Sequence, residues 1–304
     1  MPDRHSVLFK SGKFVKGIPI VYGWSHDDGS GSALPASDYQ NEEEMKVAFK
    51  PFSHALTDDD FKTLFSLYPA SDFETELSNF KCNKRDSDPE VPVHFFRLSR
   101  MLRDILFTCS SLSFGYEMSR QSKALDRTFP GVRLYDLNQS MLTPMMATVG
   151  LPHMGVCHGS DTHYILNGLF PEGTVEEADQ SLARSMTAAF INFAYTGNPT
   201  VPGDEHFDQW PESFPENFNE GSIPSSFNLQ LVGGPFGTGP GTLKTKDNSY
   251  WARFTDAVQI PMGQDMGYGE MGSATSQARQ QLIEREKLVE RCLFIDTLSE
   301  KLGI

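Results

Sequence analysis

The sequence has no apolar run of the length that a membrane-spanning helix needs, about 18 to 20 residues. Its first residues, Met1-Pro2-Asp3-Arg4-His5, also lack the apolar core of a secretory signal. We therefore expect neither a membrane span nor a signal peptide on this chain. Its location inside or outside the cell is left open.

Positive charge is scarce as well. The 304 residues contain 26 Lys and Arg against 40 Asp and Glu, which gives a formal net charge of −14. A surface that binds nucleic acid needs a clustered excess of Lys and Arg, which neutralises phosphates and releases their counterions. The charge balance therefore argues against a nucleic-acid partner. A cationic partner is one alternative, and an acidic, solvated surface is the other.

Cysteine is sparse, and no Cys-x-x-Cys spacing occurs among Cys82, Cys109, Cys157 and Cys292. The chain thus lacks the pattern of a zinc ribbon and that of a thioredoxin-like redox site. If all four cysteines were oxidised, three pairings would be possible, and their spacing does not choose among them. No metal ion and no organic cofactor is implied by the sequence.

What the sequence does contain is a succession of strand-like and helix-like segments. Its 38% of apolar residues is normal for a globular protein with a core. Short β-branched or alternating runs predict three strands, over residues 17–23, 131–137 and 227–232. Helical segments separate them, which predicts the α/β class with a mostly parallel sheet. Three strands are few for such a sheet, and a buried first strand implies neighbours that nothing before residue 17 can supply.

Apolar residues at helical spacing predict five helices, over residues 42–49, 57–68, 93–109, 175–195 and 276–302. Thr57 is expected to cap the second helix. Arg97, Arg100 and Arg103 fall largely off the apolar face of the third helix, so no function is assigned to them. Residues 233–241, rich in glycine and interrupted by proline, are expected to form a flexible surface loop rather than a phosphate-binding loop.

Two loops carry residues that acid–base chemistry needs. Ser25-His26-Asp27-Asp28-Gly29 follows the first predicted strand, and Gly155-Val156-Cys157-His158-Gly159-Ser160-Asp161 lies far downstream. Open α/β sheets place their sites at the carboxyl ends of parallel strands. One imidazole nitrogen can accept a proton from a hydroxyl while the other donates to a carboxylate that fixes the tautomer. One hypothesis is therefore that His158 is a base with an acidic partner in the first loop.

Three plainer interpretations of these residues stay open. The Asp27-Asp28-Gly29 segment has the composition of an ordinary turn. His158 can be a loop histidine without any chemical role. A metal site from His153, His158, Asp161 and His163 is the third, although five-residue intervals place the histidines on no common helical face.

Longer motifs resemble one family, the type-B carboxylesterases that include cholinesterases and fungal lipases. The His158 loop, Phe190-Ile191-Asn192-Phe193-Ala194-Tyr195-Thr196-Gly197-Asn198-Pro199 and Trp210-Pro211 resemble its C-terminal half. Pro2-Asp3-Arg4, Gly17-Ile18-Pro19 and Asp27-Asp28-Gly29 resemble the segment that leads to its acid, and Arg291-Cys292-Leu293-Phe294 resembles its terminal cysteine motif. The matches keep the family's order. Residues 1–304 are therefore expected to be the C-terminal portion of such a domain, with an incomplete α/β-hydrolase fold.

The resemblance also implies roles for single residues. His158 matches the general base and Asp28 the acidic member of the triad, where glutamate is commoner; Asp27 is the fallback if the register is off by one. Cys109 and Cys292 match positions that form a disulfide in relatives. Such a bond would close a very long loop and stabilise the fold by several kcal/mol in the simple loop model. Relatives are often secreted, a compartment that suits a disulfide.

The nucleophile of the family is missing. Its serine sits in a Gly-x-Ser-x-Gly motif, and no serine of this chain has that context. Losing the serine costs a triad enzyme roughly six orders of magnitude in turnover. We therefore expect a carboxylic-ester hydrolase-like chain that is inactive by itself, a truncated, split or wrongly assembled product whose parent acts on a small-molecule carboxylic ester. The alternative is a non-catalytic remnant or binding module that pairs with a separate N-terminal half.

Overall fold

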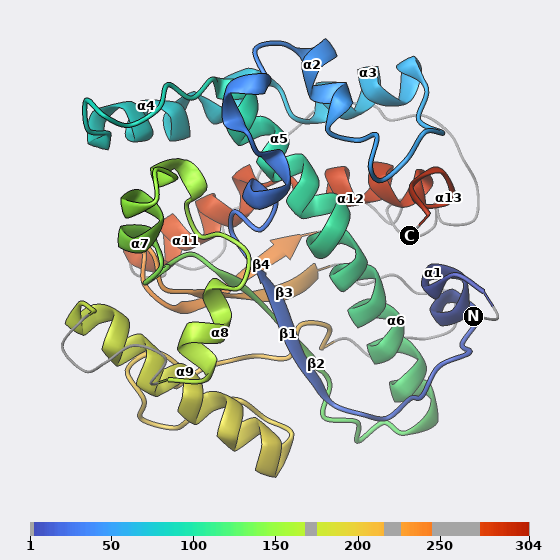
Figure 1. Cartoon of the computed structure of the whole chain (residues 1–304). Coiled ribbons are helices and arrows are strands. Elements are labelled where there is room, and N and C mark those ends of the chain that lie inside the picture. The colour runs from blue at the N-terminus through green and yellow to red at the C-terminus, as the bar shows by residue number, and fades with distance from the viewer. Residues whose placement is uncertain (1–2, 168–174, 216–225, 245–273, 304) are drawn as a thin grey trace.

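The computed structural model describes residues 3–167, 175–215, 226–244 and 274–303. A four-stranded sheet in the order β1-β2-β3-β4 lies at its centre (Figure 1). The strands are β1 (Ile20–Ser25), β2 (Val132–Leu137), β3 (Ser226–Val232) and β4 (Gly239–Lys244). β2 runs parallel to β1 and to β3, whereas β4 is antiparallel to β3. The predicted α/β class with a mostly parallel sheet is confirmed.

β4 shows that the loop prediction for residues 233–241 is wrong for its last three residues, 239–241. Glycine and proline form strands poorly, which is why the sequence suggests a loop there. Here the helix α11 (Ala274–Arg285) packs closely against the strand. A Cβ atom on Gly241 would lie 2.2 Å from the side chain of Ile283, and one on Gly239 would lie 2.7 Å from that of Arg279. The glycines are therefore what allows this helix to cover the strand.

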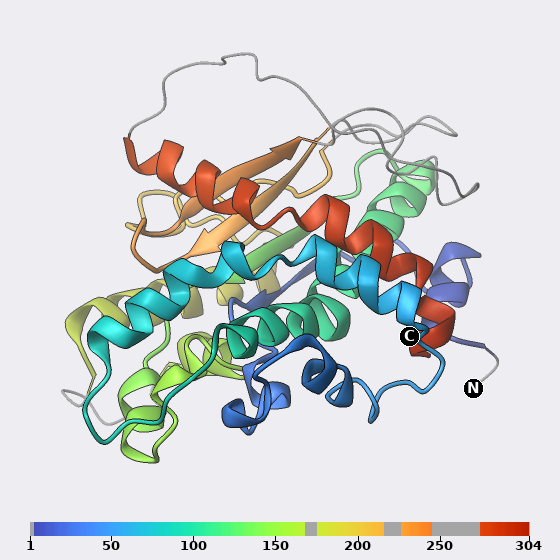
Figure 2. The ribbon, with the colours of Figure 1, turned by 90° about the horizontal axis from the view of Figure 1, so that it is seen from above.

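Helices cover both faces of the sheet, because alternate residues of β2 point in opposite directions. Val132 and Leu134 belong to one core, with α5 (Val93–Arg103), α6 (Cys109–Leu125), α11 and α12 (Leu288–Thr297). Tyr135 and Leu137 belong to the other core, under α9 (Glu177–Thr196). Figure 1 shows α9 below the sheet and α2 to α5 above it, and Figure 2 shows α11 and α12 crossing the molecule. The sheet is thus enclosed between two helical layers.

Shorter elements complete the fold. The remaining α-helices are α1 (His5–Lys10), α2 (Glu42–Val47), α3 (Asp58–Leu67), α4 (Glu74–Asn83), α7 (Thr143–Thr148), α8 (Ser160–Ile165) and α13 (Ser299–Leu302). Single 3-10 turns are η1 (Ser30–Ala33), η2 (Ala36–Asp38), η3 (Ala70–Phe73) and η5 (Pro152–Met154). Thr57 and Asp60 form a capping box at α3, which confirms the predicted cap. No helix in the described ranges is long and apolar enough to cross a membrane.

Two predicted helices have other limits in the structure. The helix predicted over residues 93–109 continues to Leu125, through a π-helical turn η4 (Asp104–Thr108) between α5 and α6. The helix predicted over residues 276–302 is three helices, α11, α12 and α13. Lys287, with φ of 46°, separates the first two. Because lysine is not a breaker in sequence terms, nothing in the pattern indicates this bend.

The three arginines of α5 also correct the sequence analysis. Arg97, Arg100 and Arg103 are all buried, although the helical pattern places them off the apolar face. α5 is packed against η1 in the loop after β1 and against η3, and Glu286, which lies between α11 and α12, contacts Arg100 and Arg103. The arginines are therefore enclosed from a second direction, and they need buried partners.

A disulfide joins Cys109 and Cys292, which confirms the pairing that the family resemblance implies. It links residues 183 positions apart and fastens α12 to the start of α6. Cys82 and Cys157 are free, the first exposed and the second buried. Lys10 of α1 pairs with Asp296 of α12 at 2.9 Å, so α1 lies beside α12.

Candidate active site

The loop Ser25–Gly29, called the acid loop below, begins where β1 ends and packs against α5. A Cβ atom on Gly29 would lie 2.0 Å from the carbonyl oxygen of Ser99, so only glycine fits there. Asp28, just before this glycine, is buried with 6% of its side chain exposed. One of its carboxylate oxygens accepts the backbone N–H of Ser25 at 2.8 Å. The loop therefore holds its carboxylate in one orientation.

The loop Gly155–Asp161, called the base loop below, brings His158 to this carboxylate. The Nδ1 atom of His158 lies 2.9 Å from the free oxygen of Asp28. Its ring stacks on Phe107 of η4, with centroids 4.9 Å apart and planes at 26°. The side chain is nonetheless 68% exposed. Among the described residues Nε2 of His158 has no recorded hydrogen bond or ion pair, so the second nitrogen is open.

The contact with Asp28 favours the tautomer of His158 that carries a proton on Nδ1. Burial raises the pKa of Asp28, while the Ser25 N–H and His158 oppose this rise by stabilising the carboxylate. An ionised Asp28 accepts a hydrogen bond and therefore draws the imidazole proton to Nδ1. The lone pair of Nε2 is then free to accept a proton from another molecule.

Asp27 has a different task. Its carboxylate accepts the backbone N–H of Val156 at 2.9 Å, and its own N–H donates to the carbonyl of Val156 at 3.0 Å. A Cβ atom on Gly155 would lie 2.2 Å from this carboxylate, so the glycine makes room for it. The geometry thus brings Asp28 rather than Asp27 to His158, and Asp27 fastens the two loops together.

A second histidine–aspartate pair lies deeper in the molecule. Nδ1 of His26 is 3.3 Å from the carboxylate of Asp136, a residue of β2. Its Nε2, however, is 2.8 Å from a guanidinium nitrogen of Arg100, which must act as the donor. Both nitrogens of His26 are therefore engaged, Nδ1 with Asp136 and Nε2 with Arg100.

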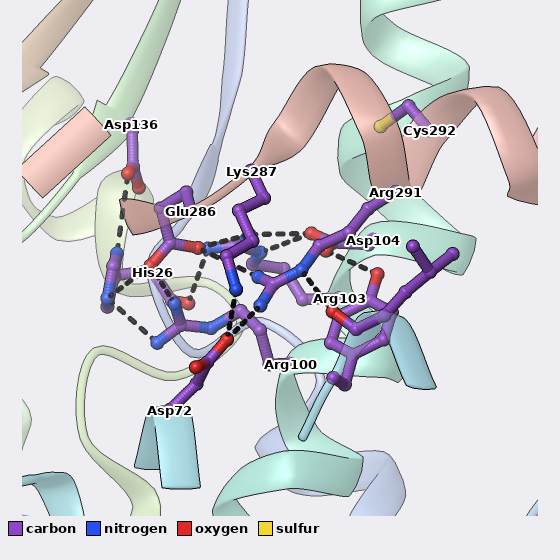
Figure 3. A network of polar contacts seen from close by, with 12 residues as sticks. His26, Asp72, Arg100, Arg103, Asp104, Asp136, Glu286, Lys287, Arg291 and Cys292 are labelled. Atoms are coloured by element: carbon purple, nitrogen blue, oxygen red, sulfur yellow. Dashed lines mark hydrogen bonds and ion pairs between the residues drawn. The ribbon is translucent and has the colours of Figure 1, made fainter. Parts of the chain in front are cut away.

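Arg100 belongs to a buried ionic network that the sequence analysis missed. Figure 3 shows Glu286 at its centre, between His26 and the guanidinium groups of Arg100, Arg103 and Arg291. Arg103 also binds Asp104, whose carboxylate accepts the hydroxyl of Tyr68 at 2.7 Å. Arg100 and Arg103, three residues apart in a helix that is otherwise mostly apolar, are the one sequence signal that could have indicated it.

The residues of the alternative metal site do not converge. The hydroxyl of Tyr135 donates to Asp161 at 2.8 Å, His153 packs edge-on against Phe95, and Nδ1 of His163 lies 3.2 Å from the carbonyl of Gly159. In the part of the chain that the structure describes, no three His, Cys, Asp or Glu side chains are placed to share a metal ion.

The structure brings no serine hydroxyl of the described residues into hydrogen-bond contact with His158. Ser30 and Ser160, which both follow a glycine, are buried. The hydroxyl of Ser160 is 2.8 Å from that of Ser140, so it is engaged elsewhere. The arrangement therefore contains an acid and a base without a nucleophile from these ranges.

A mostly parallel sheet between helical layers, with a His–Asp pair in the loops that follow its strands, defines a partial α/β-hydrolase. The family model for the carboxylesterase family matches residues 1–228. The chain belongs to this family.

Two curated relatives of the chain are fungal. The chain is 28% identical over 217 residues to "Inactive carboxylesterase-like protein VdtD" of Byssochlamys spectabilis, covering 70% of this chain and 35% of that protein. It is 24% identical over 221 residues to the secreted lipase ARB07186/07185 of Arthroderma benhamiae, covering 70% and 34%. The crystal structure of Aspergillus niger EstA has the same fold, with a TM-score of 0.57 at 16% identity over all of this chain and 44% of EstA. The chain thus spans about a third of the length of these curated relatives.

Proposed function

We propose that this chain supplies the base and the acid of a carboxylic-ester hydrolase, with His158 as the general base and Asp28 as the residue that orients it. The observation that carries the proposal is the contrast within one ring: Nδ1 is 2.9 Å from a buried carboxylate, and Nε2 is open. By itself the chain is catalytically inactive, because it lacks the serine.

In the completed site, Nε2 of His158 takes the proton of a serine hydroxyl while the serine oxygen attacks the ester carbonyl carbon. The imidazolium then gives this proton to the departing alcohol, which leaves an acyl-serine. Water repeats the two steps and releases the carboxylic acid. Asp28 stays ionised throughout and stabilises the imidazolium, and Phe107 holds one face of the ring.

Inactivity of the isolated chain follows from the size of the serine's contribution. Without its nucleophile a triad enzyme loses roughly six orders of magnitude in turnover, even when base and acid are in place. The name of the Byssochlamys relative calls that protein inactive. This supports an inactive chain here, while the family membership supports small carboxylic esters as substrates of the completed site.

The serine must come from another segment, and the sheet offers a place for it. β1 is the outermost strand, and its far edge pairs with no strand in the described ranges. An open edge strand exposes unpaired N–H and C=O groups, which can pair with a further strand. A serine-bearing segment, either from a longer polypeptide or from a separate chain, would therefore complete the sheet beside β1. A non-catalytic binding module that pairs with such a half would use the same edge.

The test is complementation. The Gly-x-Ser-x-Gly portion of a fungal carboxylesterase is fused ahead of this chain, and hydrolysis of p-nitrophenyl butyrate is measured. We expect hydrolysis by the fusion, its loss in His158→Ala and Asp28→Ala, and full activity in the surface control His54→Ala. A folded fusion that hydrolyses the ester equally well with His158→Ala would overturn the assignment, and a folded fusion that is inactive would favour the binding module.

A further inference from the structure

Glu286 lies in a position that no catalytic role explains. It follows α11, directly before Lys287, where the terminal helices bend. Its carboxylate is buried, and removing such a charge from water is unfavourable by several kcal/mol unless partners compensate. The bend therefore places the carboxylate of Glu286 in the interior, next to the acid loop.

Three guanidinium groups compensate this buried charge. One oxygen binds Arg100, and the other accepts from Arg103 at 2.8 Å and lies 3.8 Å from Arg291. These neighbours hold the pKa of Glu286 well below its usual range, although burial alone would raise it. Glu286 is thus ionised, and it fixes the directions in which the arginines point (Figure 3).

Two of these arginines contact the acid loop. Arg100 donates to Nε2 of His26 at 2.8 Å and lies 3.7 Å from the carboxylate of Asp27. Arg103 donates to the main-chain carbonyl of His26 at 3.3 Å. Arg100 and Arg103, which Glu286 orients, therefore contact the two residues immediately before Asp28.

These contacts continue to the base loop. The carboxylate of Asp27 that faces Arg100 also accepts the N–H of Val156, two residues before His158. A continuous series of contacts thus runs from Glu286 through Arg100 and Asp27 to Val156. The disulfide between Cys109 and Cys292 fastens the helix that follows Glu286 to α6, which begins directly after η4 with Phe107.

We infer that Glu286 is a positioning residue, which holds Asp28 and His158 in register by orienting Arg100 and Arg103 beneath the two loops. The terminal helices are then part of the site's construction rather than a passive cover. This inference deepens the proposed function and rests on it for its catalytic meaning.

The test uses hydrogen exchange on the intact chain, which needs no serine and no activity. Two amides report the register: Val156, which donates to Asp27, and Ser25, which donates to Asp28. Asn228 of β3, which donates to the carbonyl of Ser213, reports the rest of the fold. The variant Glu286→Gln keeps the shape and removes the charge. Glu290→Gln, on the exposed side of α12, is the matched control.

In Glu286→Gln we expect exchange at Val156 and Ser25 to be about tenfold faster than in Glu290→Gln, with Asn228 changed less than about twofold. Long-range 1H–15N spectra are expected to show His158 losing its preference for the Nδ1–H tautomer. Unchanged exchange at Val156 and Ser25 would overturn the inference, and so would equal acceleration at all three amides, which indicates general loosening only.

A second variant tests the inference if Glu286→Gln does not fold. Glu286→Asp keeps the charge but withdraws the carboxylate by one methylene, and it is expected to accelerate the same two amides. Exchange at both amides equal to that of Glu290→Gln would refute the positioning role. These rates are independent of ester hydrolysis: an inactive serine fusion would refute the proposed function and leave the exchange result standing.

Discussion

Two histidine–aspartate pairs lie at the same end of this sheet, and they differ in the second nitrogen of the ring. His158 faces Asp28 through Nδ1 and leaves Nε2 open, in a side chain that is 68% exposed. His26 faces Asp136 through Nδ1, but Arg100 occupies its Nε2. A carboxylate beside an imidazole therefore does not by itself make a base. A free second nitrogen is also needed.

The pairs also differ in what depends on them. His26 belongs to a buried network in which each charge is balanced by its neighbours, so removing one member leaves another unpaired. His158 contacts one carboxylate and one phenyl ring at the surface. The buried pair should thus govern stability, and the exposed pair should govern chemistry.

The largest effect is expected at the centre of the buried network. Arg103→Leu leaves Glu286 and Asp104 short of a partner, so the free energy of unfolding should fall by about 3–5 kcal/mol. Urea denaturation measures the loss. Arg120→Leu, which removes a partly exposed pair with Glu117, should change stability by less than about 1 kcal/mol. Equal losses in the two variants would contradict a network that carries stability.

The disulfide acts on the same side of the molecule. Serine at both Cys109 and Cys292 should lower the free energy of unfolding by about 2–4 kcal/mol, because the bond closes a long loop in the unfolded chain. Thermal unfolding with and without reductant checks this. Cys82→Ser, at an exposed free thiol, serves as the control and should unfold like the parent chain.

The histidines themselves give the sharpest comparison. His26→Gln leaves the Asp136 carboxylate and a buried guanidinium with poorer partners, a loss of about 1–3 kcal/mol. His158→Gln, at an exposed position, should stay within about 0.5 kcal/mol of the parent chain. If urea denaturation showed the larger loss for His158→Gln, the division between the two pairs would be wrong.

The smallest effect concerns Asp28 and has the opposite sign. Because burial raises the pKa of Asp28, the folded chain binds this proton more tightly than the unfolded chain does. The resulting stability exists below the ordinary pKa of aspartate and is lost as pH rises through the folded value. Asp28→Asn should therefore melt higher at neutral pH, by on the order of 2 °C, and the gain should vanish in acid. A gain that grew toward low pH would reverse this account.

The candidate site could be predicted further than the network. His158 and Asp28 lie in glycine-containing loops after apolar strands, and the family resemblance implies the roles that we propose for them. The distances then follow from the fold, in which Gly29 and Gly155 allow close approach. Local pattern and family order were enough to bring these two residues together.

The network could not be predicted because its members meet only in the folded chain. Helical periodicity weighs apolar residues, so it treats Arg100 and Arg103 as solvent-facing. Their partner Glu286 is far away in sequence, at a bend where neither glycine nor proline occurs to indicate the end of a helix. β4 escaped prediction for a related reason, since packing of α11 overrides the low strand propensity of Gly239 and Gly241.

The central claim is that this chain carries an oriented base without a nucleophile. The most direct measurement compares the purified chain and its His158→Ala variant for hydrolysis of p-nitrophenyl butyrate and for labelling by a fluorophosphonate. We predict identical background hydrolysis and no labelled serine in either protein. Hydrolysis together with a labelled serine in the parent chain, both lost in His158→Ala, would contradict the claim.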